Sequence, residues 1–144
     1  SGVLELAIKL MGSRNRWGDV ASEMATFVRD YGFAVVENFV GHGIGKNMHE
    51  DPQVPNFCSP SFRRKHDFEL EPGLVIAVEP MVNMGTKKVR PLPDFWTQST
   101  ADGKYSAHFE HTIAMTEDGP WALTADPRSG EEEETTGAAT TTQG

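Results

Sequence analysis

Residues 40–52 read Val-Gly-His-Gly-Ile-Gly-Lys-Asn-Met-His-Glu-Asp-Pro. Glycine occupies every second position from Gly41 to Gly45, which removes side chains and lets the backbone approach a ligand closely. His42 and His49 are therefore expected to emerge from one short loop, and imidazole is both a frequent metal ligand and the side chain that titrates closest to neutral pH. The pair predicts a functional site. The alternative, which this stretch alone leaves open, is a glycine-rich connector with surface histidines.

The composition is that of one globular domain. The chain has 144 residues, of which 38% are hydrophobic and 24% charged, and its formal net charge is −8. This acidity argues against a general nucleic-acid or anionic-membrane binder, because phosphate contacts need clustered Lys and Arg. The single cysteine, Cys58, excludes an internal disulfide, and no apolar run approaches the roughly 20 residues of a membrane-spanning helix. We therefore expect a soluble, cytoplasmic protein.

Helical patterns dominate the first part of the chain. Residues 3–11 mix strong helix formers with apolar positions, and a second helix is expected to begin with Asp19 as its cap and to end at Gly32. Residues 33–36 are aromatic and β-branched, which predicts a strand that leads into the glycine loop. Prolines at positions 52, 55 and 60 are expected to keep the segment after the loop irregular.

Strand patterns dominate the second part. Residues 74–80 predict a strand that Glu79 closes, and residues 84–94 predict a loop. Residues 95–100 and 105–116 are expected to pair as a hairpin through a turn at Asp102-Gly103, and a further turn at Asp118-Gly119 leads to a last strand. The result is a mainly antiparallel sheet.

The last residues have a different composition. Residues 129–144 contain four consecutive glutamates followed by Thr, Gly and Ala, with no aromatic and no aliphatic side chain larger than Ala. Such a segment cannot bury enough surface to order itself. The sequence therefore predicts a folded portion over residues 1–128 and a disordered acidic tail over residues 129–144.

Four side chains at turns or strand ends could carry chemistry: His42, His49, Glu79 and Glu110. A carboxylate at the end of an apolar strand, such as Glu79, either has a cation or donors nearby or protrudes beyond the sheet edge. Carboxylates with imidazole suit Mn²⁺, Fe²⁺, Co²⁺ or Zn²⁺ sites that activate water. Strand alternation places His108 on the face of Glu110 and His111 on the other face, so His111 is expected to be structural.

Four motifs, in this order, closely resemble those of type I methionine aminopeptidases. They are Gly-His-Gly-Ile-Gly with Met-His-Glu-Asp-Pro (41–52), Glu-Pro-Gly-Leu-Val-Ile-Ala-Val-Glu-Pro-Met-Val-Asn (71–83), Trp-Thr (96–97) and Glu-His-Thr (110–112). The resemblance runs from about residue 3 to 125. Xaa-Pro peptidases share the fold and a similar histidine loop, but segments 79–83 and 96–112 look like the methionine enzymes. The resemblance implies a pita-bread α/β (α+β) fold, here its C-terminal half, with helices packed on a curved, mainly antiparallel sheet.

The resemblance also implies an activity, namely removal of N-terminal methionine from nascent proteins and peptides by a metal-activated water. It implies two divalent ions in the complete enzyme, which could be Mn, Fe, Co or Zn. His42, Glu79 and Glu110 match family ligands, with Glu110 expected to bridge both ions and Glu79 expected to move the proton of the attacking water. Association with the ribosome is a further expectation.

The substrate would be held by side chains that match other family positions. His49 matches the histidine that hydrogen-bonds the substrate and steadies the tetrahedral intermediate. Trp96 matches a residue that lines the methionine pocket. Met48 occupies a pocket position where the family often has Phe, and its flexible thioether could pack on a methionine side chain.

The chain departs from the family pattern in one respect. The family's two aspartate ligands and another catalytic histidine lie on strands before the first helix seen here, and neither Asp19 nor Asp30 occupies a matching position. We therefore expect an incomplete fragment that is inactive alone and exposes an apolar face where the missing N-terminal half of the same fold would pack. The alternative function is a non-catalytic pita-bread module that binds peptides or proteins.

Overall fold

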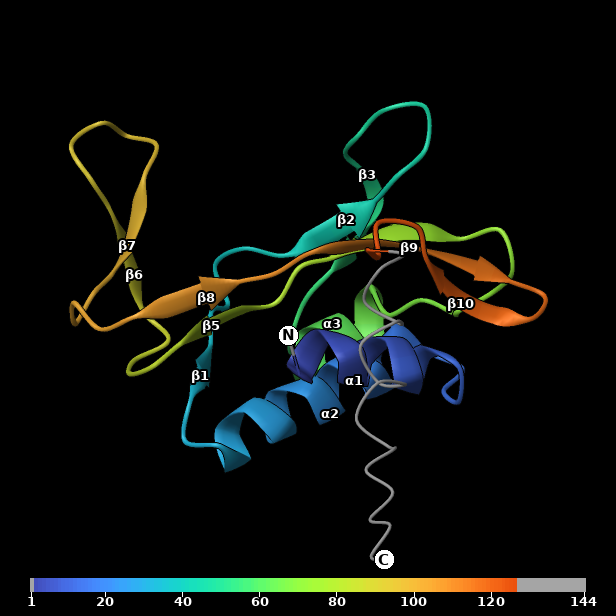
Figure 1. The fold of residues 1–144 in the computed structure, drawn as a ribbon, viewed down its shortest axis with the longest axis horizontal. Coiled ribbons are helices and arrows are strands. Elements are labelled where there is room, and N and C mark those ends of the chain that lie inside the picture. Colours follow the sequence, from blue (N-terminus) through green and yellow to red (C-terminus); the bar gives the residue numbers. More distant parts are fainter. Residues whose placement is uncertain (1, 127–144) are drawn as a thin grey trace, which may run out of the picture.

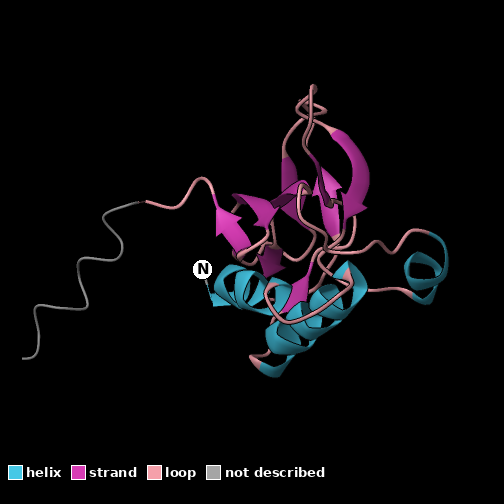
Figure 2. Ribbon diagram, turned by 90° about the vertical axis from the view of Figure 1, so that its right-hand side faces the viewer, coloured by secondary structure: helices cyan, strands magenta, loops and turns pink. Residues whose placement is uncertain are grey.

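The computed structural model describes residues 2–126, so the tail predicted over residues 129–144 lies outside the described residues. The helices are α1 (Gly2–Met11), α2 (Trp17–Asp30) and the short α3 (Pro60–Lys65). They lie along one side of the strands (Figures 1 and 2). Within the described part of the chain, no helix is long and apolar enough to cross a membrane.

The strands form antiparallel sheets, the largest of which has five strands in the order β10-β9-β4-β2-β3. Its members are β2 (Gly41–Gly43), β3 (Glu50–Val54), β4 (Val75–Val78), β9 (His111–Thr116) and β10 (Gly119–Ala122). A three-stranded sheet has the order β1-β5-β8, with β1 (Ala34–Val35), β5 (Met81–Asn83) and β8 (Ser106–His108). The hairpin of β6 (Val89–Pro91) and β7 (Gln98–Thr100) projects from the smaller sheet (Figure 1).

The hydrophobic core lies between the two long helices and the five-stranded sheet. Trp17 is fully buried at the start of α2, where its ring stacks on Phe68 and its indole Nε1 donates to the carbonyl oxygen of Pro55 at 2.9 Å. The other large buried side chains come from all three helices and from β3, β4 and β9: Leu4, Leu10, Met11, Val20, Met24, Val54, Phe62, Ile76, Val78, Ile113 and Met115. Burial of these apolar faces fixes the sheet against the helices.

The start of α2 differs from the sequence prediction. Arg16, rather than Asp19, is the N-cap residue, and its own side chain makes no cap hydrogen bond. Instead the buried carboxylate of Asp67 accepts the Gly18 backbone N–H at 2.8 Å. Asp19 lies in the first turn and pairs with Arg63. The cap therefore comes from a residue distant in sequence, which local pattern could not reveal.

The strand pairing also corrects two predictions. Residues 50–54 form β3 rather than an irregular segment, because β3 lies at the edge of the sheet, where a strand tolerates a residue such as Pro52 that has no N–H. The hairpin predicted between residues 95–100 and 105–116 is wrong. Instead β7 pairs with β6, inside the predicted 84–94 loop, while β8 pairs with β5 and β9 with β4. The predicted turn at Asp118-Gly119 is confirmed by the β9–β10 pairing.

Candidate metal centre

The predicted glycine loop begins as a β-strand in the interior of the five-stranded sheet. β2 lies between β4 and β3, and a Cβ atom on Gly41 would overlap the carbonyl oxygen of Ala77. A Cβ atom on Gly43 would likewise overlap the carbonyl oxygen of Asp51. These glycines therefore allow neighbouring strands to pack closely, and the predicted close approach of this backbone to a ligand stays a prediction. The register shifts between His42 and Gly43, an irregularity of the kind that re-aims a side chain.

Three of the predicted ligands converge from separate parts of the fold. His42 lies on β2, Glu79 directly follows β4, and Glu110 lies between β8 and β9. One ligand atom from each side chain lies within 4.8 Å of the others. His42 Nε2 is 3.7 Å from Glu79 Oε1, and His42 Nδ1 is 3.0 Å from the carbonyl oxygen of Gly43. In the tautomer protonated at Nδ1, the ring donates to that carbonyl and presents the Nε2 lone pair to the carboxylates.

This donor set fits a divalent cation. Imidazole nitrogen and carboxylate oxygen are ligands of Mn²⁺, Fe²⁺, Co²⁺ and Zn²⁺. His42 and Glu79 are half-buried and Glu110 is exposed, so an ion there would keep coordination positions open to water and substrate. Across residues 2–126 this is the one cluster of three or more such side chains with ligand geometry.

Glu79 has the most perturbed environment of the cluster. Burial is the main cause that raises the pKa of its carboxyl above the ordinary value, and the nearby Glu110 carboxylate raises it further. His108 and His42 act in the opposite direction without cancelling the rise. The Glu79 backbone is also held, because the Asn56 side-chain amide donates to its carbonyl oxygen at 3.2 Å.

The predicted substrate-binding residues lie at different places. The ring of His49 lies next to that of His42, with the centroids 4.2 Å apart. Met48 is 72% exposed in the turn between β2 and β3. Trp96 is 87% exposed in the turn between β6 and β7, where Asp94 accepts its backbone N–H. The structure thus brings His49 to the cluster and leaves Met48 and Trp96 exposed, and the substrate roles of all three residues stay predictions.

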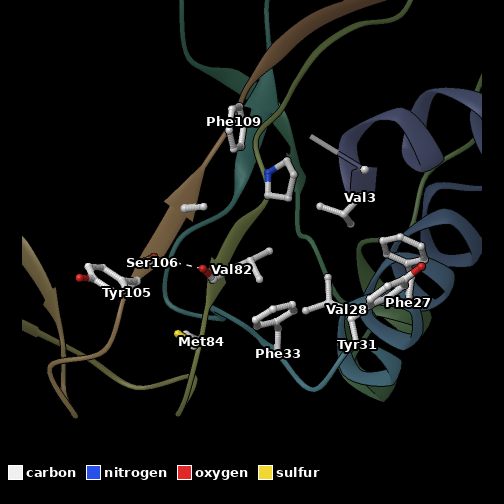
Figure 3. Close-up of a pocket in the computed structure, with 13 residues that line it drawn as sticks. Val3, Phe27, Val28, Tyr31, Phe33, Val82, Met84, Tyr105, Ser106 and Phe109 are labelled. Carbon is white, nitrogen blue, oxygen red and sulfur yellow. Dashed lines mark hydrogen bonds between the residues drawn. The ribbon is translucent and has the colours of Figure 1, made fainter.

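An apolar groove of about 610 Å³ begins beside the cluster. Pro80 and Phe109, the sequence neighbours of Glu79 and Glu110, line the groove, as does Tyr31, which follows α2. Figure 3 shows Phe33, Val82 and Tyr105 along its length. Tyr105 is 85% exposed and Tyr31 67% exposed, so large rings face solvent here. An exposed apolar surface is therefore present here, and its covering by an N-terminal half of the same fold stays a prediction.

Sequence reasoning did not assign a role to His108. Its Nε2 atom lies 3.2 Å from Glu79 Oε2, on the opposite side of the carboxylate from His42. The sequence did contain an indication that His108 lies near the site, because strand alternation places His108 on the same face as Glu110. By contrast, His111 Nδ1 lies 2.9 Å from the Thr124 hydroxyl, which agrees with a structural role.

Comparison with known proteins agrees with this fold and with a metal-binding site. The model of metallopeptidase family M24 matches residues 2–117. The methionine aminopeptidase of Clostridium perfringens is 52% identical over 110 residues, which are 76% of this chain and 43% of the relative. Methionine aminopeptidase 1 of Bacillus subtilis is 47% identical over 104 residues, which are 72% of this chain and 40% of the relative. The crystal structure of the methionine aminopeptidase from Thermotoga maritima matches with a TM-score of 0.78 at 43% identity, over 87% of this chain and 49% of that chain.

An antiparallel sheet with helices on one side and an imidazole–carboxylate cluster at its strand ends defines a metallopeptidase of the pita-bread type. The chain belongs to metallopeptidase family M24. The predictions of fold and family are thereby confirmed. The chain spans less than half the length of the relatives that it matches.

Proposed function

We propose that this chain supplies metal-binding and substrate-binding groups of a methionine aminopeptidase, which removes N-terminal methionine from nascent proteins and peptides. The observation that carries the proposal is the convergence of His42, Glu79 and Glu110 within 4.8 Å. The relatives named methionine aminopeptidase, at 52% and 47% identity, support the same substrate. We place the activity in the cytoplasm, where nascent chains emerge, and association with the ribosome stays a prediction.

The chemistry follows from the groups around the cluster. His42, Glu79 and Glu110 would hold a divalent ion, which would supply an activated water and a Lewis acid for the scissile carbonyl. Under this proposal Glu79, whose Oε1 faces His42 and whose Oε2 contacts His108, takes a proton from that water and returns it to the leaving amine. Under the same proposal His49, whose ring lies next to that of His42, donates a hydrogen bond to the oxygen of the substrate carbonyl.

We propose in addition that the activity needs a further polypeptide segment with two carboxylate ligands. Three donors suffice for one ion, whereas two ions require more carboxylates than the described cluster offers. The groove beside the cluster is apolar, and Gly2 and Val3 line it, so a segment that precedes Ser1 would start beside it. Under this proposal the segment covers the groove, completes the two-ion site and closes the methionine pocket, and the chain alone is inactive.

The test is a complementation assay. The 144-residue chain is assayed for release of methionine from a Met-Ala-Ser peptide with Mn²⁺ or Co²⁺, alone and after co-expression with the upstream half of the Clostridium perfringens methionine aminopeptidase. We expect release only from the combination, and loss of release when Glu110 is replaced by Ala. Activity of the chain alone would contradict the requirement for a second segment. Absence of metal-dependent release from a stably formed complex would contradict the proposed function.

The alternative function, a non-catalytic peptide-binding module, is not favoured. It gives no reason for an imidazole and two carboxylates to meet at strand ends, where clustered acidic groups destabilise the fold without a cation. The two functions differ in their dependence on metal. A binding module would retain a Met-Ala-Ser peptide in the presence of EDTA, whereas the aminopeptidase site would lose it.

A further inference from the structure

His108 holds one oxygen of the Glu79 carboxylate while the other oxygen faces the metal cluster. Glu79 Oε2 lies 3.2 Å from His108 Nε2, and Glu79 Oε1 lies 3.7 Å from His42 Nε2. The Glu79 side chain is only 14% exposed, so few water molecules can compete for these oxygens. A carboxylate flanked in this way has a defined orientation.

The backbone fixes His108 relative to Glu79. His108 is the last residue of β8 and pairs in register with Met81, the first residue of β5. Just outside the two strands, the N–H of Phe109, which follows β8, donates to the carbonyl oxygen of Pro80, which precedes β5, at 3.5 Å. The sheet therefore sets the distance between the imidazole and the carboxylate, and the contact does not depend on a flexible loop.

We propose that His108 is a positioning residue for Glu79: its Nε2–H donates to Oε2 and thereby directs Oε1 toward the ion held with His42 and Glu110. The inference rests on the proposed metal site. It adds a residue that touches neither ion nor substrate but determines how well the ion is bound. Loss of such an outer contact typically weakens metal affinity about 10-fold to 100-fold.

The first test measures the affinity of the intact chain for Mn²⁺, by the electron paramagnetic resonance signal of the free ion. His108→Leu removes the N–H donor, whereas His108→Gln keeps one. His66→Leu, at an exposed position that ends α3, is the matched control. We expect about a 10-fold to 100-fold loss for His108→Leu, and affinities within about threefold of the original for the other two variants. Circular dichroism checks that all variants keep the fold.

Two results would overturn the inference. Equal Mn²⁺ affinity for His108→Leu and the original chain would show that the contact does not position Glu79. Equal loss in His108→Gln and His108→Leu would show that the imidazole nitrogen itself binds the ion, so that His108 is a ligand.

A second measurement needs no metal and separates this inference from the proposed function. Nitrogen-15 spectra of the His108 ring in the metal-free chain report which nitrogen carries a proton. We expect a protonated Nε2 whose resonance shifts in Glu79→Gln, and an unprotonated Nε2 would overturn the inference. Failure of the original chain to bind Mn²⁺ would instead count against the proposed metal site. The ring spectra would still show whether His108 Nε2–H donates to Glu79.

Discussion

At the scale of single residues, Gly41 determines how closely β2 approaches β4. A Cβ atom at this position would overlap the Ala77 carbonyl oxygen, a backbone atom that cannot rotate away. Gly41→Ala should therefore lower the free energy of unfolding by about 1–3 kcal/mol or more, measured by urea denaturation. Gly12→Ala is the control, because its added carbon would meet its nearest neighbours at an ordinary 3.5 Å. Equal stability of the two variants would contradict the close packing described for β2.

The carboxyl of Glu79 gives a prediction with a definite pH dependence. Because its pKa is raised in the folded chain, the ionised form is less stable there than in the unfolded chain, and this destabilisation is present above the folded pKa. Glu79→Gln should thus raise the Tm of the metal-free chain at pH 7. The difference should shrink as pH falls from 7 toward about 4, because the carboxyl then becomes largely protonated in both the folded and the unfolded chain.

Thermal melts in EDTA at pH 7 and pH 4 measure this effect, and the exposed Glu71→Gln is the control. With excess Mn²⁺ the order should reverse, because an ion that binds only the folded original chain stabilises it. A lower Tm for Glu79→Gln in EDTA at pH 7 would contradict burial and repulsion as the dominant influences on this carboxyl.

Much of the candidate site could be predicted from residue types and motif order. His42, Glu79 and Glu110 were chosen from the sequence and lie together in space, because strand ends and a histidine beside glycine are local signals. The contact between His108 and Glu79 was not predicted, since it depends on the pairing of β8 with β5. Trp96 is a residue whose motif is visible in the sequence but whose position is not. Its position relative to the site depends on the β6–β7 hairpin, where its side chain is largely exposed.

At the scale of secondary-structure elements, α2 begins against a carboxylate from another segment. Asp67, with 1% of its side chain exposed, accepts the Gly18 N–H at 2.8 Å and pairs with Arg16. Asp67→Ala should cost about 1–3 kcal/mol of stability, because it removes a cap and leaves a buried donor unsatisfied. Glu69→Ala removes only an exposed ion pair with Arg16 and should cost less than about 1 kcal/mol. Urea denaturation of both variants distinguishes a buried cap from a surface charge effect, and equal losses would contradict the cap.

The positions of helices and strands were easier to predict than the pairing of the strands. The two long helices, the strand at residues 74–80 and the final turn follow from periodicity and glycine placement. The pairing of β7 with β6 could not be found in this way, because the Asp102-Gly103 turn is a strong local hairpin signal. In the structure Asp102 instead accepts the Thr86 and Lys104 backbone N–H groups, and tertiary pairing overrides the local signal.

At the scale of the whole molecule, the apolar groove predicts self-association of the isolated chain. About 610 Å³ of apolar groove with exposed aromatic rings is the kind of surface that soluble monomers cover. The chain should therefore sediment as assemblies larger than a monomer at micromolar concentration. Replacing Met84 and Tyr105, two well-exposed lining residues, by Ser should shift the distribution toward monomer without loss of fold, because neither contributes to the buried core.

Trp121→Ser provides the control for that experiment, since Trp121 is 63% exposed on β10 and does not line the groove. If general surface hydrophobicity drives association, Trp121→Ser should act as strongly as the groove variant. If the groove drives it, only the double variant should yield monomer, and adding the upstream half of a relative should have the same effect by covering the groove. A monodisperse monomer with a cooperative melt in the unaltered chain would contradict both explanations, because the groove would then be a stable solvent-facing surface.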